Sequence, residues 1–165
     1  MSDLRRFRAS EQTVARSVLD RLLDDEPSVE TDRARPVGEQ VAEAREALRR
    51  DLEALLNTRC RPVSPPAALA DALLGYGVES LFGTSLVTQD ARAALARSLE
   101  RRIGAFEPRL EEVSVEAAPP RGAERSLRLR IRARCKVHLG LPPMAFETRM
   151  DPATQRFHVE STRSE

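Results

Sequence analysis

The chain has 165 residues, which is enough for one domain with a sizeable hydrophobic core. Hydrophobic residues make up 41% of the chain and charged residues 32%, a balance typical of folded soluble proteins rather than disordered ones. The net charge of +1 favours neither nucleic acid nor an anionic membrane as a partner, and an aromatic content of 4% without Trp argues against proteins that grip sugars or single-stranded bases.

The N-terminal residues 1–9 are rich in Arg and lack the apolar segment of a signal peptide, so we predict a flexible basic arm. A single domain is predicted over residues 10–165. Its first helix begins at Ser10 and ends near Pro27, and a mobile polar connector follows over residues 28–35. No window is apolar for long enough to cross a membrane, so we expect a cytoplasmic protein without direct membrane insertion.

A second helix is predicted from Pro36, a residue favoured in the first turn, to the Pro-rich break at residues 61–66. Glu53 and Asn57 are one turn apart on its polar side. The opposite side carries a narrow apolar stripe, which Leu56 widens at its end. The other members of the stripe are Val37, Val41, Ala44, Leu48, Leu52 and Leu55.

A short helix over residues 67–75 and an irregular loop over residues 75–83 are expected next, with Tyr76 anchored on the core. Thr88 is placed to cap a third helix, and Pro108 stops it. The buried stripe of this helix consists of Leu95, Leu99, Ile103 and Phe106.

After Pro108 the apolar period falls to two residues, the period of a β-strand. The clearest strand covers residues 126–137. Strands near residues 113–115, 144–150 and 156–160 complete an antiparallel meander, the last two joined by the turn sequence DPATQ. Helices followed by a meander predict an α+β fold, with the helices on one face of a small, mainly antiparallel sheet.

The strand over residues 126–137 carries its basic side chains on one face: Arg128, Arg130, Arg132, Arg134 and Lys136. Binding of a nucleic-acid duplex by this face is one interpretation. The favoured one is a solvated outer face, whose repulsion is relieved by acidic residues on the neighbouring strands, among Glu112, Glu116, Glu147 and Glu160. An acidic protein partner is a further use open to the same face.

Cysteine and histidine residues give no sign of a metal site. Cys60 and Cys135 form no CxxC pair and are predicted to be free thiols, and His138 and His158 are expected on the surface without neighbouring ligands. No metal ligand or cofactor site is therefore predicted.

Signs of catalysis are equally weak. The chain lacks the sequence motifs of a nucleophile elbow, a phosphate-binding loop and a zinc peptidase. Glu53 with Glu107 is the pair open to a glycosidase, but such a pair must lie about 5–10 Å apart across a sugar cleft. No catalytic residue is predicted.

Glu107 follows the third helix in the string FEPRL, residues 106–110. The helix dipole disfavours a carboxylate at this end by about 0.3–1 kcal/mol. A locally unfavourable choice of this kind often marks a functional site. The alternative is a local contact on the surface between an exposed Glu107 and Arg109, which contributes little to stability.

The strings EALLNTR (residues 53–59) and FEPRL (residues 106–110), preceded by SVLDRLLDDEP (residues 17–27), resemble the TssE family of type VI secretion baseplate subunits. This family is related to the small wedge protein of contractile phage tail baseplates, and the resemblance covers residues 17–159. It implies a non-enzymatic structural subunit. An old lysozyme-like label of the family keeps a peptidoglycan glycosidase as the alternative.

The resemblance also implies partners. The subunit would sit on a helical bundle of the wedge proteins TssF and TssG and would template the first ring of the TssB–TssC sheath. TssK is a further candidate partner, and these proteins would recruit the subunit to the baseplate at the inner membrane. Carried over by position, Glu107, Pro108 and Arg109 would contact the wedge bundle.

Within EALLNTR, Leu55 and Leu56 are predicted to pack internally, whereas the polar residues are predicted to face a partner. The full predicted partner-binding set is Glu53, Asn57, Thr58, Arg59, Glu107, Pro108 and Arg109. An open edge of the sheet can accept a strand from a sheath subunit. Docking of this kind requires the charged groups at the two helix ends to be accessible rather than locked inside the domain.

Overall fold

The computed structural model describes residues 36–60, 72, 75–81, 86–118, 126–136 and 143–162. The predicted arm, first helix and connector lie outside the described residues, as do Val137, His138 and most of the predicted short helix. The chain divides into two compact units, Met1–Ala47 and Leu48–Glu165. The sheet, helix α3 and the last part of helix α2 belong to the second unit.

Helix α2, Val37–Asn57, is the second predicted helix. The carbonyl of Pro36 accepts hydrogen bonds from the N–H groups of Glu39 at 3.0 Å and Gln40 at 3.2 Å, so the proline opens the first turn. In the second unit, the apolar stripe is buried as predicted, with Leu48, Leu52, Leu55 and Leu56 each at most 3% exposed.

Helix α3, Gln89–Phe106, is the third predicted helix. The side-chain oxygen of Thr88 accepts a hydrogen bond from the N–H of Ala91 at 3.2 Å, which confirms the predicted cap. Leu99 and Ile103 are buried, and Leu95 and Phe106 pack against the same core. Both predicted features of this helix, its cap and its apolar stripe, are therefore confirmed.

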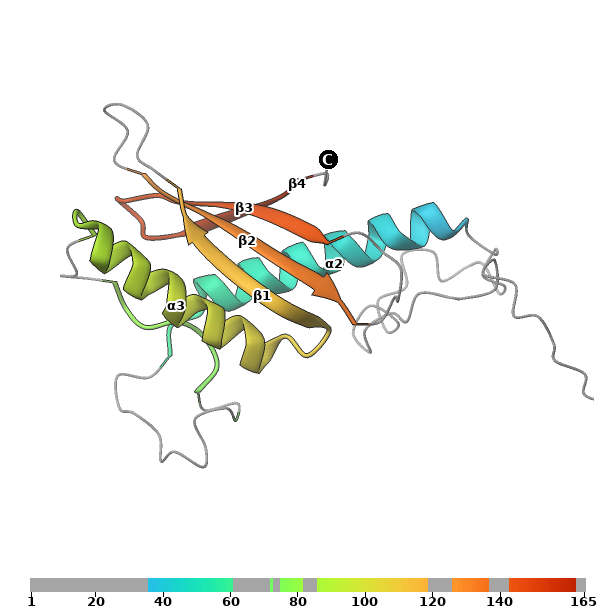
Figure 1. Cartoon of the computed structure of the whole chain (residues 1–165), viewed down its shortest axis with the longest axis horizontal. Coiled ribbons are helices and arrows are strands. Elements are labelled where there is room, and N and C mark those ends of the chain that lie inside the picture. The colour runs from blue at the N-terminus through green and yellow to red at the C-terminus, as the bar shows by residue number, and fades with distance from the viewer. Residues whose placement is uncertain are drawn as a thin grey trace, which may run out of the picture. The chain divides into compact units, whose positions relative to one another are not determined.

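Four antiparallel strands form one sheet in the order β1-β2-β3-β4 (Figure 1). Their bounds are Leu110–Ala117 for β1, Leu127–Cys135 for β2, Met144–Met150 for β3 and Phe157–Thr162 for β4. The turn between β3 and β4 is held by the carboxylate of Asp151, which accepts a hydrogen bond from the N–H of Ala153 at 2.8 Å. The predicted meander is confirmed.

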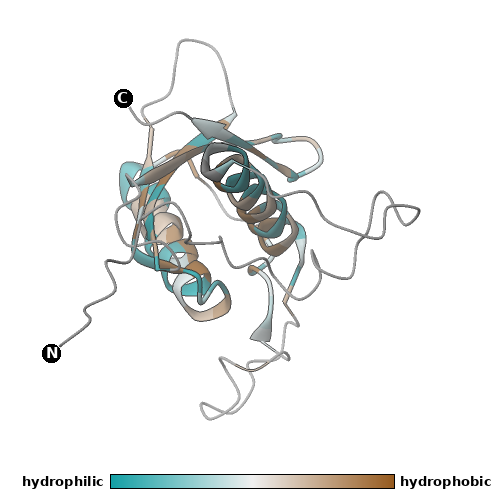
Figure 2. Cartoon of the chain, turned by 90° about the vertical axis from the view of Figure 1, so that its right-hand side faces the viewer, coloured by the Kyte–Doolittle hydropathy of each residue, from teal (hydrophilic) through white to brown (hydrophobic). Residues whose placement is uncertain are grey.

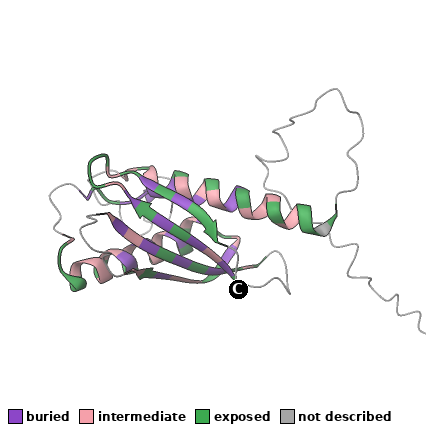
Figure 3. Ribbon diagram, turned by 90° about the horizontal axis from the view of Figure 1, so that it is seen from above, coloured by how far each residue is buried: buried purple, intermediate pink, exposed green. Residues whose placement is uncertain are grey.

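Burial alternates along the strands, as the banding in Figure 3 shows. The inner face of β2 and β3 is apolar except for Thr148, and Ile131 and Phe146 at its centre are fully buried. Helix α3 and the part of α2 in this unit lie on the same side of the sheet (Figure 2). The predicted α+β fold is thus correct, and no helix of the described residues lies on the outer face of the sheet.

The outer face carries cross-strand ion pairs. Arg130 binds Glu147 at 2.8 Å, Arg132 binds Glu116 at 3.2 Å and Arg134 binds Glu112 at 3.0 Å. Glu112 reaches its partner from a bulge in β1, where its φ is +50°. The predicted relief of repulsion on the basic strand is confirmed for these three arginines.

Candidate partner-binding site at the ends of helices α2 and α3

Glu107 is the C-cap of α3, and its carboxylate points into the domain with only 8% of the side chain exposed. Arg109 binds it with a fork: Nε donates to Oε1 at 2.6 Å and Nη2 donates to Oε2 at 2.6 Å. The backbone N–H of Arg109 also donates to Oε1 at 3.3 Å. A planar guanidinium thus neutralises a buried carboxylate.

The expectation of an exposed Glu107 is therefore wrong. Pro108 lies in a turn that brings Arg109 back over Glu107, and the paired charge offsets the unfavourable helix dipole. Arg109 is itself 22% exposed, so only part of its guanidinium can reach a partner. In this string, Pro108 is the exposed side chain.

Asp51 completes this cluster from α2, because Nη2 of Arg109 also donates to its carboxylate. Tyr76 lies beside the cluster and packs edge-on against Phe106, with ring centroids 5.4 Å apart. Burial raises the pKa of Tyr76, and the negative charges of Asp51 and Glu107 raise it further. The pKa of Arg109 is raised chiefly by its hydrogen bond to Glu107. Tyr76 is anchored on the core, as predicted.

The pKa of Tyr76 gives a direct test of this geometry. Because the chain has one tyrosine, the phenolate absorbance reports Tyr76 alone. We expect its midpoint above 10.0 in the native domain and near 10.0, its ordinary value, in denaturant. Above that pH the unfolded chain loses the phenol proton while the folded chain retains it, so the free energy of unfolding falls as the pH rises. Tyr76→Phe should remove this part of the fall, and equal midpoints in both states would contradict the geometry.

Asn57 forms a peptide-like pair with Phe157 on β4. The N–H of Phe157 donates to Oδ1 at 2.9 Å, and Nδ2 donates to the carbonyl of Phe157 at 2.8 Å. Arg49 adds a hydrogen bond from Nη1 to the carbonyl of Val159 at 3.2 Å. Since β3 pairs with the other side of β4, these side chains of α2 occupy part of the outer edge of the sheet.

Glu53 lies on the same side of α2. It pairs with Arg49 one turn earlier, and its Oε1 is 3.9 Å from Nδ1 of the exposed His158. Glu53 therefore holds Arg49 in place at the edge of β4, and 30% of its own side chain remains exposed.

Arg59 and Thr58 continue the chain beyond α2. Arg59 donates from Nη1 to the carbonyl of Leu56 at 3.1 Å and from Nη2 to the carbonyl of Gln155 at 2.6 Å. It thereby fastens the end of the helix to the turn between β3 and β4. The exposed Thr58 donates its hydroxyl to the carbonyl of Ala54 at 2.7 Å.

The structure thus sorts the predicted residues into two groups. One surrounds Arg109, and the other extends from Glu53 to Arg59 along β4 and its preceding turn. Sequence reasoning missed the internal partners of these residues, which are Arg49, Asp51, Gln155 and the backbone of Phe157. Apart from the i,i+4 pair of Arg49 and Glu53, these contacts link positions 58 to 110 residues apart, which no periodic pattern signals.

The glycosidase alternative gains nothing from this arrangement. Glu53 is bound to Arg49 and Glu107 to Arg109. The pocket of about 400 Å³ on the sheet is lined by neither glutamate. Cys60 and Cys135 are free thiols, as predicted. Among the described residues, no group of three His, Cys, Asp or Glu could hold a metal ion. No helix in the described part of the chain is long and apolar enough to cross a bilayer.

A comparison with known protein families identifies the family of this chain. The family described as baseplate wedge protein gp25 matches residues 42–139, more than half of the chain, and this stretch includes both motifs. The chain belongs to the baseplate wedge protein gp25 family. This is the family of TssE, so the resemblance found in EALLNTR and FEPRL is confirmed. No curated protein matches the chain. Membership of the gp25 family indicates a structural role in a phage-tail-like baseplate.

Proposed function

We propose that this gp25-family chain is a non-enzymatic baseplate subunit of a type VI secretion system. It joins the TssF–TssG wedge to the first ring of the TssB–TssC sheath, and its partners, TssK among them, hold it at the inner-membrane baseplate from the cytoplasm. The family match across both motifs carries this proposal. The hydrogen bonds of Arg109, Asn57 and Arg59 within the domain give these residues a second role, which is to shape the two helix ends. Glu107 is buried and therefore supports the surface through Arg109 rather than by direct contact.

The wedge surface is proposed around the exposed parts of the motifs. Thr58 and Pro108 are exposed, and the side chains of Asp51 and Arg109 are 45% and 22% exposed. A rigid surface of this kind binds without a large ordering cost. The internal hydrogen bonds therefore support docking by fixing these groups in place.

Co-purification with TssF and TssG tests the wedge contact. Thr58→Arg and Pro108→Arg each add a bulky cation to an exposed position and should reduce recovery of the complex at least tenfold. Thr162→Arg, an exposed position at the end of β4, is the matched control and should bind like the unmodified chain. Failure of the unmodified chain to bind would reject the proposed function, whereas normal binding by both variants would reject only the surface.

The sheath contact is proposed at the outer edge of β1. On β4, both backbone groups of Phe157 and the carbonyl of Val159 are already bonded to α2. On β1, the N–H of Val115 points away from β2 and donates to the carboxylate of Glu100 at 3.2 Å. The N–H of Ala118 points toward β2 and donates to the carbonyl of Arg128 at 2.9 Å. The alternation of an antiparallel ladder then directs the backbone groups of Ala117 toward the outer edge of β1, as for the N–H of Val115.

Two proline substitutions test which edge of the sheet, β1 or β4, binds the sheath strand. Ala117→Pro removes an N–H from the edge of β1, and Ser161→Pro removes one from the edge of β4, and neither N–H is needed within the sheet. We expect Ala117→Pro to abolish sheath polymerisation on purified baseplates and Ser161→Pro to leave it intact. The reverse result would place the sheath strand on β4.

A further inference from the structure

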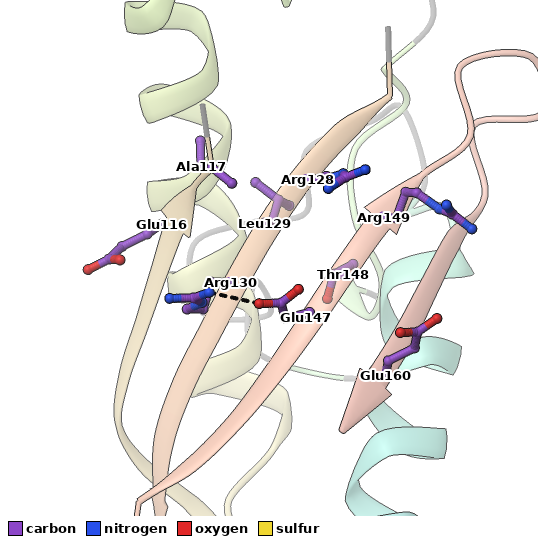
Figure 4. Close-up of a pocket in the computed structure, with 10 residues that line it drawn as sticks. Glu116, Ala117, Arg128, Leu129, Arg130, Glu147, Thr148, Arg149 and Glu160 are labelled. Atoms are coloured by element: carbon purple, nitrogen blue, oxygen red, sulfur yellow. Dashed lines mark hydrogen bonds and ion pairs between the residues drawn. The ribbon is translucent and has the colours of Figure 1, made fainter. Parts of the chain in front are cut away.

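A pocket of about 400 Å³ lies on the outer face of the sheet, opposite the face that packs against α2 and α3. Figure 4 shows charged side chains from all four strands around it. Three arginines and three glutamates line it: Arg128, Arg130, Arg149, Glu116, Glu147 and Glu160. None of these residues belongs to the two helix-end motifs, so the pocket is separate from the proposed wedge surface; through Ala117 it adjoins the edge of β1 proposed for the sheath.

Two pairs of like charge face each other in this pocket, and Arg130 stands between Glu116 and Glu147 in the row of the second pair. Arg128 on β2 stands directly opposite Arg149 on β3, and Glu147 on β3 stands directly opposite Glu160 on β4. Like charges directly opposite each other destabilise a sheet. The two pairs are displaced by two residues along the strands, or about 6.6–6.8 Å. A basic row and an acidic row therefore lie next to each other.

Part of this charge is not neutralised within the domain. Arg130 and Glu147 pair at 2.8 Å. The exposed side chains of Arg149 and Glu160, in contrast, form no hydrogen bond or ion pair with any residue that the structure describes. The pocket thus presents one cation and one anion to the solvent in neighbouring rows.

We propose that this pocket binds an extended segment of a protein partner that carries an acidic and a basic residue two positions apart. Side chains at positions i and i+2 of an extended chain lie on the same side, about 6.6–6.8 Å apart, which is the spacing of the two rows. The acidic residue contacts the Arg128–Arg149 row and the basic residue contacts the Glu147–Glu160 row. A nucleic acid fits less well, because the glutamates that line the pocket repel phosphates.

Peptide titration followed by NMR chemical shifts of the full chain tests this proposal. The probe is the blocked peptide Thr-Glu-Thr-Arg-Thr, and its two controls replace Arg by Glu or Glu by Arg. We expect the amides of β2, β3 and β4 around the pocket to shift, with the mixed peptide bound about fivefold more tightly than either control, since one exposed ion pair is exchanged for a repulsion. No pocket-confined shift at millimolar peptide, or equal binding of all three peptides, would overturn the proposal.

Charge reversal adds a second arm. Arg149→Glu puts an acidic side chain at position 149 as well as at Glu160. The variant should therefore lose the preference for the mixed peptide and bind the peptide with two arginines more tightly. Arg97→Glu, an exposed position on α3, is the matched control and should leave the preference unchanged. An unchanged preference in Arg149→Glu, or tighter binding of a short DNA duplex than of the mixed peptide, would also overturn the proposal.

Discussion

Replacing Arg109 by leucine should lower the free energy of unfolding by about 3 kcal/mol, because it leaves the buried carboxylate of Glu107 without its partner. This is the lower end of the range for broken buried pairs, since Arg109 is 22% exposed and some water reaches the site. Asp51, which is 45% exposed, can be solvated after the change and adds little to the loss. Denaturant unfolding followed by circular dichroism measures the effect.

A double variant shows how much of the lost stability comes from the unpaired charge of Glu107 and how much from lost packing of Arg109. Glu107→Leu with Arg109→Leu removes both charges, so the double variant should be more stable than Arg109→Leu alone. Arg109→Lys keeps the charge but loses the fork, and an intermediate loss is expected. A double variant less stable than Arg109→Leu would show that Glu107 does not depend on this pairing.

Gly77→Ala should cost about 2–4 kcal/mol, because the position combines a positive φ with close backbone neighbours. Its φ is +104°, and a Cβ atom would lie 2.5 Å from the carbonyl oxygen of Thr58 and 3.1 Å from the N atom of Cys60. This is where the chain after α2 pairs with Val78: the N–H of Val78 donates to Thr58 at 2.8 Å, and the N–H of Cys60 donates to Val78 at 3.0 Å. The substitution must therefore push the end of EALLNTR away from its neighbours.

The matched control is Gly104→Ala on α3. Gly104 is an exposed helical glycine, and a Cβ atom added there meets nothing within 4 Å. Alanine at this position should raise the free energy of unfolding by about 0.5–1 kcal/mol, since it is the better helix former. If both alanine variants unfold at the same denaturant concentration, the close approach of Gly77 to Thr58 is wrong.

Gly77→Ala and Arg109→Leu should affect docking as well as stability. Gly77→Ala displaces Thr58 and Arg59, while Arg109→Leu removes the group that connects Asp51 on α2 to Glu107. We therefore expect weaker wedge binding from Gly77→Ala, which displaces the surface, and from Arg109→Leu, which removes both a proposed contact and a support of the surface. Stability measurements must accompany each binding assay. Loss of binding alone does not distinguish a residue that contacts the partner from one that holds the binding surface in place.

Periodic features of the fold could be predicted from the sequence. The alternation in SLRLRIRARC predicts one buried and one charged face of β2, and the stripe ending in Leu55 and Leu56 predicts the buried side of α2. The cap at Thr88 is equally predictable, because a capping side chain forms its hydrogen bond within the first turn of its own helix. Local chemistry and period are enough for such features.

Contacts between distant positions could not be predicted in the same way. Glu107 was recognised as unusual from the helix dipole, but its burial depends on the turn at Pro108 and on Asp51, 58 residues before Arg109. The polar side of α2 predicts a partner surface for Asn57 but not the internal contact of its amide. That amide pairs with a backbone 100 residues away, which only the assembled sheet supplies.

The most direct test of the proposed role is an electron cryo-microscopy reconstruction of type VI baseplates assembled with this chain. The proposed role predicts density for its α+β domain between the TssF–TssG bundle and the first sheath ring, with Thr58 and Pro108 facing the bundle and β1 facing the sheath. Complete baseplates that carry a sheath but lack this domain, or hold it away from both, would contradict that role.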